Sequence, residues 1–141
     1  MQKKQIRFYH ALRIVIALIA LYSMILGVLN WSITTYWLTW LQMPISADYP
    51  FWPKQSGAMH VGLALAYGLG AVIPRYLAAS VWVIILSKIV AVLFLFSEYF
   101  MHSAPIILFV GFGDSSILIV TGVIAWNVYR CKDDQGQAIQ D

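Results

Sequence analysis

The runs YLAASVWVIILSKIVAVLFLFS (residues 76–97) and APIILFVGFGDSSILIVTGVIAW (residues 104–126) decide the fold of this chain. Each run is interrupted by a single charged residue, Lys88 in the first and Asp114 in the second. A helix rises about 1.5 Å per residue, so each run gives about 33 to 37 Å of helix and can cross the hydrocarbon core of a bilayer. We therefore predict two transmembrane helices.

The two interior charges are predicted to meet. In an antiparallel hairpin, Lys88 lies about 18 Å from the start of its helix at Tyr76, and Asp114 lies about 21 Å from the opposite end at Val128. The two groups then share nearly one depth, where an ammonium group is costly unless a carboxylate pairs with it. We predict a Lys88–Asp114 contact inside a helical bundle.

The composition argues for an integral membrane protein. Hydrophobic residues make up 61% of the chain and charged residues 11%, and the mean hydropathy is +0.76. These values argue against an ordinary soluble domain. The net charge is +3, but the nine Lys and Arg residues are scattered beside apolar runs. They indicate topology rather than a phosphate-binding patch, so we expect contact with lipid and no nucleic-acid partner.

We expect an all-α fold in which residues 1–141 form one polytopic transmembrane four-helix bundle. Basic residues gather on the cytoplasmic side of membrane proteins, and here only Lys54 is assigned to the outer side. That asymmetry predicts an inner-membrane, multi-pass protein with both termini in the cytoplasm. The predicted spans are about 11–33, 57–73, 76–97 and 104–128, followed by a polar tail at 131–141.

Residues 34–56 form the longest connection and are rich in Trp, Tyr and Phe. Such aromatic side chains gather where acyl chains meet water, which predicts a short interfacial helix from Thr35 to Met43 on the outer side. Pro44, Pro50 and Pro53 are expected to end it. The same aromatic residues are alternatively the mouth of a ligand site.

The second predicted span carries small residues at a spacing of four, namely Ala58, Gly62, Ala66 and Gly70. In lipid, close backbone approach is what favours helix association, so this face is predicted to pack against another helix of the chain. Homodimerisation through the same face is the alternative.

Two candidate sites follow from the polar residues. The first is a polar pocket around Lys88 and Asp114, to which we assign Ser87, Ser115 and Thr121. Asp114 and Thr121 share a helix face. Ionisable groups inside a membrane mark proton relays or ligand sites, but a structural ion pair that fixes helix register is an equal alternative.

The second candidate site lies on the outer side. Glu98 and His102 are four residues apart, and His60 is near the outer end of the second span. A carboxylate and an imidazole at this spacing can present two ligands to a metal, and two histidines on different helices can hold a haem iron. Both ligand sets are incomplete, and surface hydrogen bonding is the alternative for these side chains.

The assembled pattern resembles the DoxX-like group of small four-helix bacterial membrane proteins. The likeness covers about residues 11–129 and rests on SGAMHVGLALAYGLGAVIPR, then SK in the third span and GD in the fourth. The best understood members look like membrane subunits of quinone-linked sulfur or thiol oxidation assemblies. The resemblance implies a bacterial source and a central polar pocket lined by Lys88, Asp114 and His60, but carries over no catalytic residue.

Three functional hypotheses remain at this point. The first is a subunit or accessory of a membrane-associated redox or maturation system, in which a quinone is a possible cofactor and another membrane protein a possible partner. The second is a small transporter or channel for protons or a small anion that works as a homo-oligomer. The third is a membrane enzyme with an outer-side metal or haem, and no motif assigns a catalytic residue.

Overall fold

The computed structural model describes residues 3–40, 51–102 and 105–133. Within these ranges the secondary structure is helical, which confirms the predicted all-α class. The elements are α1 (Lys3–Ser32), α2 (Thr34–Trp40), α3 (Phe51–Val72), the single-turn 3-10 helix η1 (Pro74–Tyr76), α4 (Leu77–His102) and α5 (Pro105–Asp133).

Three stretches of the described chain are helical, long and apolar enough to cross a membrane. They are Ile6–Ser32, Pro74–Met101 and Pro105–Arg130. Their outward surfaces are apolar, with large side chains such as Leu18 and Phe109 exposed. A surface of this kind is expected to face lipid rather than water. The helix α3 is not among the three, since polar residues occupy its first three turns.

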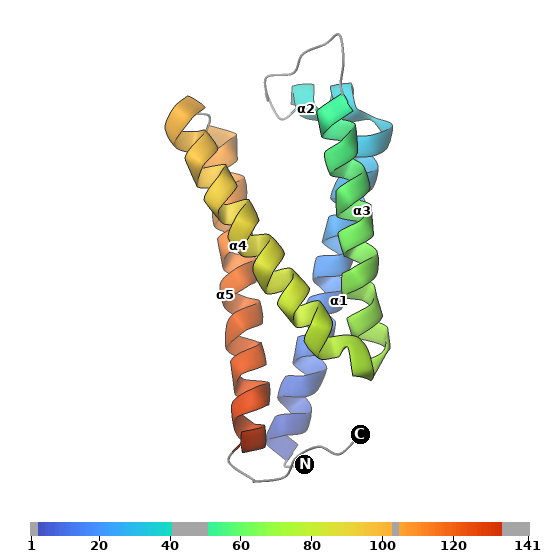
Figure 1. Ribbon diagram of the computed structural model, residues 1–141, viewed down its shortest axis with the longest axis vertical. Coiled ribbons are helices and arrows are strands. Elements are labelled where there is room, and N and C mark those ends of the chain that lie inside the picture. Colours follow the sequence, from blue (N-terminus) through green and yellow to red (C-terminus); the bar gives the residue numbers. More distant parts are fainter. Residues whose placement is uncertain (1–2, 41–50, 103–104, 134–141) are drawn as a thin grey trace.

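The long helices are arranged as two pairs (Figure 1). Helix α1 packs along α3, and α4 packs along α5. The pairs meet at the end where α1 begins and α5 finishes, and they diverge toward the end that carries α2. Helix α4 crosses obliquely from the end of α3 to the far end of α5, so it links the two pairs.

The hydrophobic core lies where the two pairs converge. Its largest fully buried side chains come from α1, α3 and α4, and α5 closes it with Ala125 and Val128. Burial is therefore concentrated at one end of the bundle. The buried cluster is Leu12, Ile16, Ile19, Tyr67, Leu77, Val81, Ile84, Ala125 and Val128.

Two glycines bring α1 and α3 into backbone contact. A Cβ atom at Gly57 would lie 2.8 Å from the carbonyl oxygen of Gly27 and 2.8 Å from the backbone nitrogen of Trp31. A Cβ atom at Gly27 would lie 2.8 Å from Cγ2 of Val61. These distances leave no room for a side chain, so the α1–α3 packing depends on both glycines.

Arg13 fixes the opposite end of the same pair. Its Nε donates a hydrogen bond to the carbonyl oxygen of Ala71 at 2.8 Å, and its Nη2 donates to that of Val72 at 3.2 Å. These carbonyls belong to the last turn of α3, which lacks intrahelical donors and carries the negative end of the helix dipole. A guanidinium from α1 therefore caps the C-terminus of α3.

Some helices extend beyond the predicted membrane spans. Helix α3 begins at Phe51, six residues before the predicted span that starts at about residue 57, and Pro53 lies in its first turn. Proline is tolerated there because the first backbone N–H groups of a helix have no partner in any case. Helix α4 continues to His102, so the expected connection from residue 98 onward is helical. Helix α2 ends at Trp40, and residues 41–50 lie outside the described residues.

Candidate functional site

The predicted ion pair is present. The Nζ atom of Lys88 on α4 donates a hydrogen bond of 2.6 Å to Oδ1 of Asp114 on α5. Their side chains are only 6% and 9% exposed, so both charges are withdrawn from the surroundings of the bundle. The predicted contact between Lys88 and Asp114 is thus confirmed.

The pair forms because the local sequence keeps both segments helical and close together. Lys88 lies in a run of β-branched and leucine residues without a helix breaker. About two turns from Lys88, a Cβ atom at Gly111 would lie 3.6 Å from the Cβ of Leu95, an ordinary packing distance, so α5 packs against α4 along this stretch. The side chains of Lys88 and Asp114 then meet between the two helices.

Lys88 retains hydrogen-bonding capacity. An ammonium group carries three N–H donors. One of them is used by Asp114, and within the described part of the chain no second acceptor contacts Nζ. The ring centroid of Tyr22 on α1 lies 5.8 Å from Nζ, a distance that permits a cation–π interaction. Two donors of a buried cation are therefore available to a water molecule or a ligand oxygen.

A tyrosine that the sequence analysis did not single out joins the site. The hydroxyl groups of Tyr67 on α3 and Ser87 on α4 are 2.7 Å apart. The Ser87 hydroxyl also donates to the carbonyl oxygen of Ile84 at 3.0 Å. A serine hydroxyl has one proton, so Tyr67 is the donor in the bond between them. No periodicity separates Tyr67 from its apolar neighbours, and only the fold places it beside Ser87.

His60 approaches the same region from α3. It is half-buried, and its Nδ1 atom is buried with no hydrogen-bond partner among the described residues. It lies two helical turns before Tyr67 on the same helix. We call Tyr22, His60, Tyr67, Ser87, Lys88 and Asp114 the central polar cluster, to which α1, α3, α4 and α5 each contribute.

The other residues assigned to this pocket behave differently. The Ser115 hydroxyl donates a hydrogen bond to the carbonyl oxygen of Gly111 at 2.8 Å, so its proton is used within α5 and not on the Asp114 carboxylate. Thr121 is fully buried, and its hydroxyl has no hydrogen-bond partner among the described residues. It lies two helical turns beyond Asp114 toward the hydrophobic core.

An apolar pocket opens beside the cluster. It has a volume of about 280 Å³ and lies between α1 and α5. Tyr22 forms part of its wall, and the same tyrosine ring faces Lys88. The remaining lining residues are Val15, Leu18, Ile19, Ser116, Ile117 and Val120. An apolar pocket that adjoins polar groups suits a molecule with an apolar tail and a polar head.

The outer-side metal site is not assembled by the described residues. Among them, no three potential ligands of the His, Cys, Asp or Glu type gather in one place. The His102 side chain lies outside the described side chains. The metal and haem hypotheses therefore stay predictions.

The small-residue face of α3 is packed at one end. The Ser80 hydroxyl on α4 donates to the carbonyl oxygen of Ala66 at 2.7 Å, and a Cβ atom at Gly70 would collide with the Ser80 side chain. Ala58 is exposed, and a Cβ atom at Gly62 would meet nothing within 4 Å. The packing assigned to this face thus reaches only its last two members, because α4 diverges from α3.

Over the residues that the structure describes, the fold and the site define an all-helical protein that carries three membrane-capable helices and a buried Lys–Asp ion pair. No protein-family model matches the chain, and comparisons with curated proteins and with solved structures give no match.

Proposed function

We propose that this chain is a four-span inner-membrane protein that binds a small amphipathic molecule of the quinone class as a subunit or accessory of a membrane redox or maturation system. In this proposal α1, α3, α4 and α5 cross the membrane, α2 lies at the outer interface, and both termini are cytoplasmic. The proposal keeps the resemblance to the DoxX-like group as its family assignment.

The topology is supported by the position of the basic residues. Arg13 bonds to the end of α3, and Arg75 follows that end by a few residues, so the two cations share one end of the bundle. Arg130 lies at the end of α5, which is at the same end (Figure 1). Basic residues mark the cytoplasmic side. At the opposite end, Tyr36 and Trp40 of α2 are exposed, as expected of an interfacial helix.

The observation that carries the ligand proposal is the unused hydrogen-bonding capacity of a buried cation beside an apolar pocket. Lys88 has two spare N–H donors, and Tyr22, whose ring centroid is 5.8 Å from this ammonium group, also lines the pocket. The oxygen of a quinone carbonyl accepts hydrogen bonds, whereas its isoprenoid tail is apolar. The ring carbonyl is placed at Lys88, and the tail lies between α1 and α5.

Extraction of the purified protein tests this proposal. Full-length protein is isolated from membranes in mild detergent, and bound quinone is extracted and measured per chain. Ser116→Leu narrows the pocket without touching the ion pair, because the Ser116 hydroxyl bonds only to the carbonyl oxygen of Phe112. Bound quinone is expected to fall in this variant.

Ser97→Leu is the matched control. Ser97 is exposed on α4, and its hydroxyl likewise bonds only to a carbonyl oxygen of its own helix. This variant is expected to retain the quinone of the original chain. Absence of quinone from the original chain, or equal retention by Ser116→Leu and Ser97→Leu, would overturn the assignment.

A second candidate function, proton transport, is favoured by the polar atoms on either side of the ion pair. The Nδ1 of His60 and the hydroxyl of Thr121 are both buried without a partner among the described residues. Together with Asp114 they place exchangeable protons along the bundle axis. Proton flux in liposomes that disappears in Asp114→Asn supports this candidate, and an unchanged leak removes it.

A further inference from the structure

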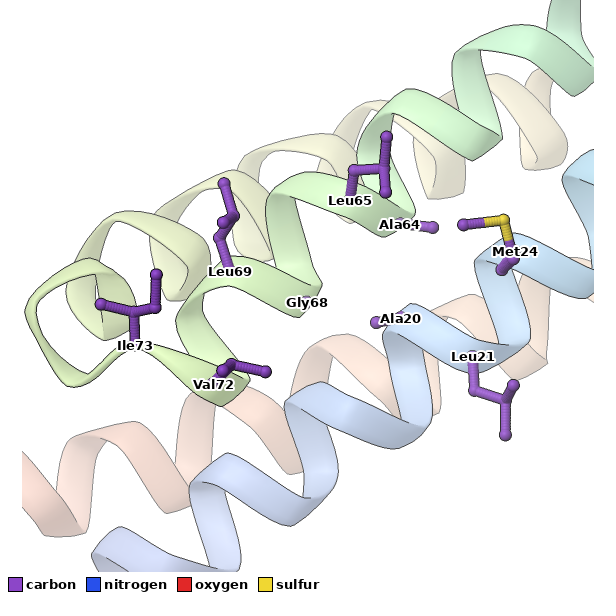
Figure 2. A pocket seen from close by; sticks show the side chains of 9 residues that line it. All are labelled: Ala20, Leu21, Met24, Ala64, Leu65, Gly68, Leu69, Val72 and Ile73. Carbon is purple, nitrogen blue, oxygen red and sulfur yellow. The ribbon is translucent and has the colours of Figure 1, made fainter.

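An apolar groove runs along the α1–α3 pair and shares no lining residue with the pocket beside the central polar cluster. Its volume is about 570 Å³, and no polar side chain lines it. Figure 2 shows Met24 and Ala64 toward one end of the groove and Val72 toward the other. On α3 it extends from Ala64 to Val72, a rise of about 12 Å, close to the roughly 15 Å of hydrocarbon in one leaflet, and Ile73 lines it just beyond the helix.

The residues that line the middle of the groove are small, which leaves space between α1 and α3. Ala20 of α1 and Gly68 of α3 lie between the two ribbons in Figure 2. A Cβ atom at Gly68 would meet no atom within 4 Å, so the space beside it is open. The groove can therefore accept a slender apolar chain without displacing a side chain of the protein.

Two arginines lie at the Val72 end. The guanidinium of Arg13 contacts the carbonyl oxygen of Val72 itself, and Arg75 is exposed two residues beyond Ile73, with its Cζ 4.7 Å from the ring centroid of Tyr76. Among the described side chains, neither guanidinium pairs with a carboxylate. Arg13 uses two of its five N–H donors on α3, so three remain.

We propose that the groove binds an anionic phospholipid of the cytoplasmic leaflet. One acyl chain lies between α1 and α3 beside Ala20 and Gly68, and the lipid phosphate is held by Arg13 and Arg75. Guanidinium groups bind phosphate through several charge-assisted hydrogen bonds, and basic pockets between transmembrane helices on the cytoplasmic side bind anionic head groups. This site rests on the proposed membrane placement of α3 but not on the quinone assignment.

The charges argue against a second copy of the chain as the occupant. Two copies related by a twofold axis along the membrane normal would bring four arginines to the same end of the interface. Such an arrangement is repulsive, whereas a phosphate neutralises the arginines. An anionic lipid is therefore the occupant that matches both the apolar wall and the charged end.

Native mass spectrometry of the full chain, extracted from membranes and titrated with lipid, tests the proposal. The probes are dioleoylphosphatidylglycerol and dioleoylphosphatidylcholine, which share acyl chains and differ in head-group charge. Phosphatidylglycerol is expected to bind more tightly. Arg75→Gln is expected to weaken binding of phosphatidylglycerol about fivefold, since one arginine near an anionic group contributes about 1 kcal/mol. Binding of phosphatidylcholine should weaken less, because its choline cation offsets the charge of its phosphate.

Gly68→Leu provides the second arm. The new side chain fills the groove, so binding of both lipids is expected to fall. The matched controls are Arg130→Gln, at another exposed arginine near the cytoplasmic end, and Gly122→Leu, at a glycine that also has open space around its Cβ position. Both controls are expected to bind lipid as the original chain does.

Three results would overturn the lipid site. They are equal binding of the two lipids, equal behaviour of Arg75→Gln and Arg130→Gln, and complete displacement of phosphatidylglycerol by inorganic phosphate, which would indicate a site for free phosphate. A chain that is absent from the membrane fraction refutes the membrane placement instead, so the two failures are distinguishable.

Discussion

Removal of one member of the buried ion pair is expected to destabilise the bundle much more than removal of both. The perturbation is the set Lys88→Met, Asp114→Leu and the double variant, in which the substituted side chains have similar volumes and no charge. In the original protein Nζ and Oδ1 are 2.6 Å apart, and the side chains are 6% and 9% exposed. The pair is therefore treated as buried rather than as a surface salt bridge.

The magnitude follows from desolvation. Each single variant leaves one charge buried without its partner, which costs about 3 to 5 kcal/mol. The double variant removes both charges and fills the space with apolar atoms, and such replacements are neutral or stabilising by about 1 to 4 kcal/mol. This double-mutant cycle should therefore show a large coupling free energy between Lys88 and Asp114. The double variant should be as stable as the original chain or more stable.

Reversible unfolding by SDS in bicelles measures these free energies. Leu86→Met, at a side chain that is 59% exposed on the same helix, serves as the control and should change stability by less than about 0.5 kcal/mol. Single variants that each lose less than about 1 kcal/mol would show that the charges are solvated, as in exposed pairs. A double variant that loses the sum of the two single effects would refute the pairing itself.

Three further predictions concern the packing and can be measured by thermal unfolding in detergent. Arg13→Ala should cost about 1.5 to 3 kcal/mol, as expected for hydrogen bonds made by a charged donor, because the last turn of α3 loses its cap; an unchanged midpoint would refute the capping role. Gly57→Ala should lower the unfolding midpoint strongly, whereas Gly62→Ala should have little effect, because only the first Cβ atom would collide with α1; equal midpoints would contradict the close approach. Tyr67→Phe should cost about 0.5 to 1.5 kcal/mol through loss of the hydrogen bond to Ser87, and a neutral result would show that the bond contributes nothing.

The ion pair was predictable because the sequence gives both the sign of each charge and its position along an apolar run, which sets its expected depth in the membrane. Lys88 and Asp114 interrupt apolar runs at positions that match in depth once the runs are antiparallel. A charge in lipid has few acceptable partners, so the matching depth of Lys88 and Asp114 identified each as the partner of the other. The helical class followed in the same way from the length and apolar character of the runs.

The helix pairing was not predictable by the same means. In a membrane protein, side chains that face lipid and side chains that face the interior are both apolar, so periodicity does not distinguish them. The face containing Ala58 and Gly62 was expected to be packed, but both residues are exposed. The close α1–α3 contact instead uses Gly27 and Gly57, which the sequence analysis did not assign to packing.

By itself, then, the sequence determined that the chain forms long apolar helices and that the cation Lys88 meets the anion Asp114. Only the tertiary structure decided that the Tyr22 ring lies beside Lys88 and that Tyr67 bonds to Ser87. It also decided that the half-buried His60 leaves its Nδ1 without a partner among the described residues and that Arg13 caps α3. The physical reason is that burying an unpaired charge is very costly, so any stable fold of the chain must bring the opposite charge next to it. A tyrosine, a histidine or an arginine near a helix end has several acceptable environments, and the packing of the helices selects among them.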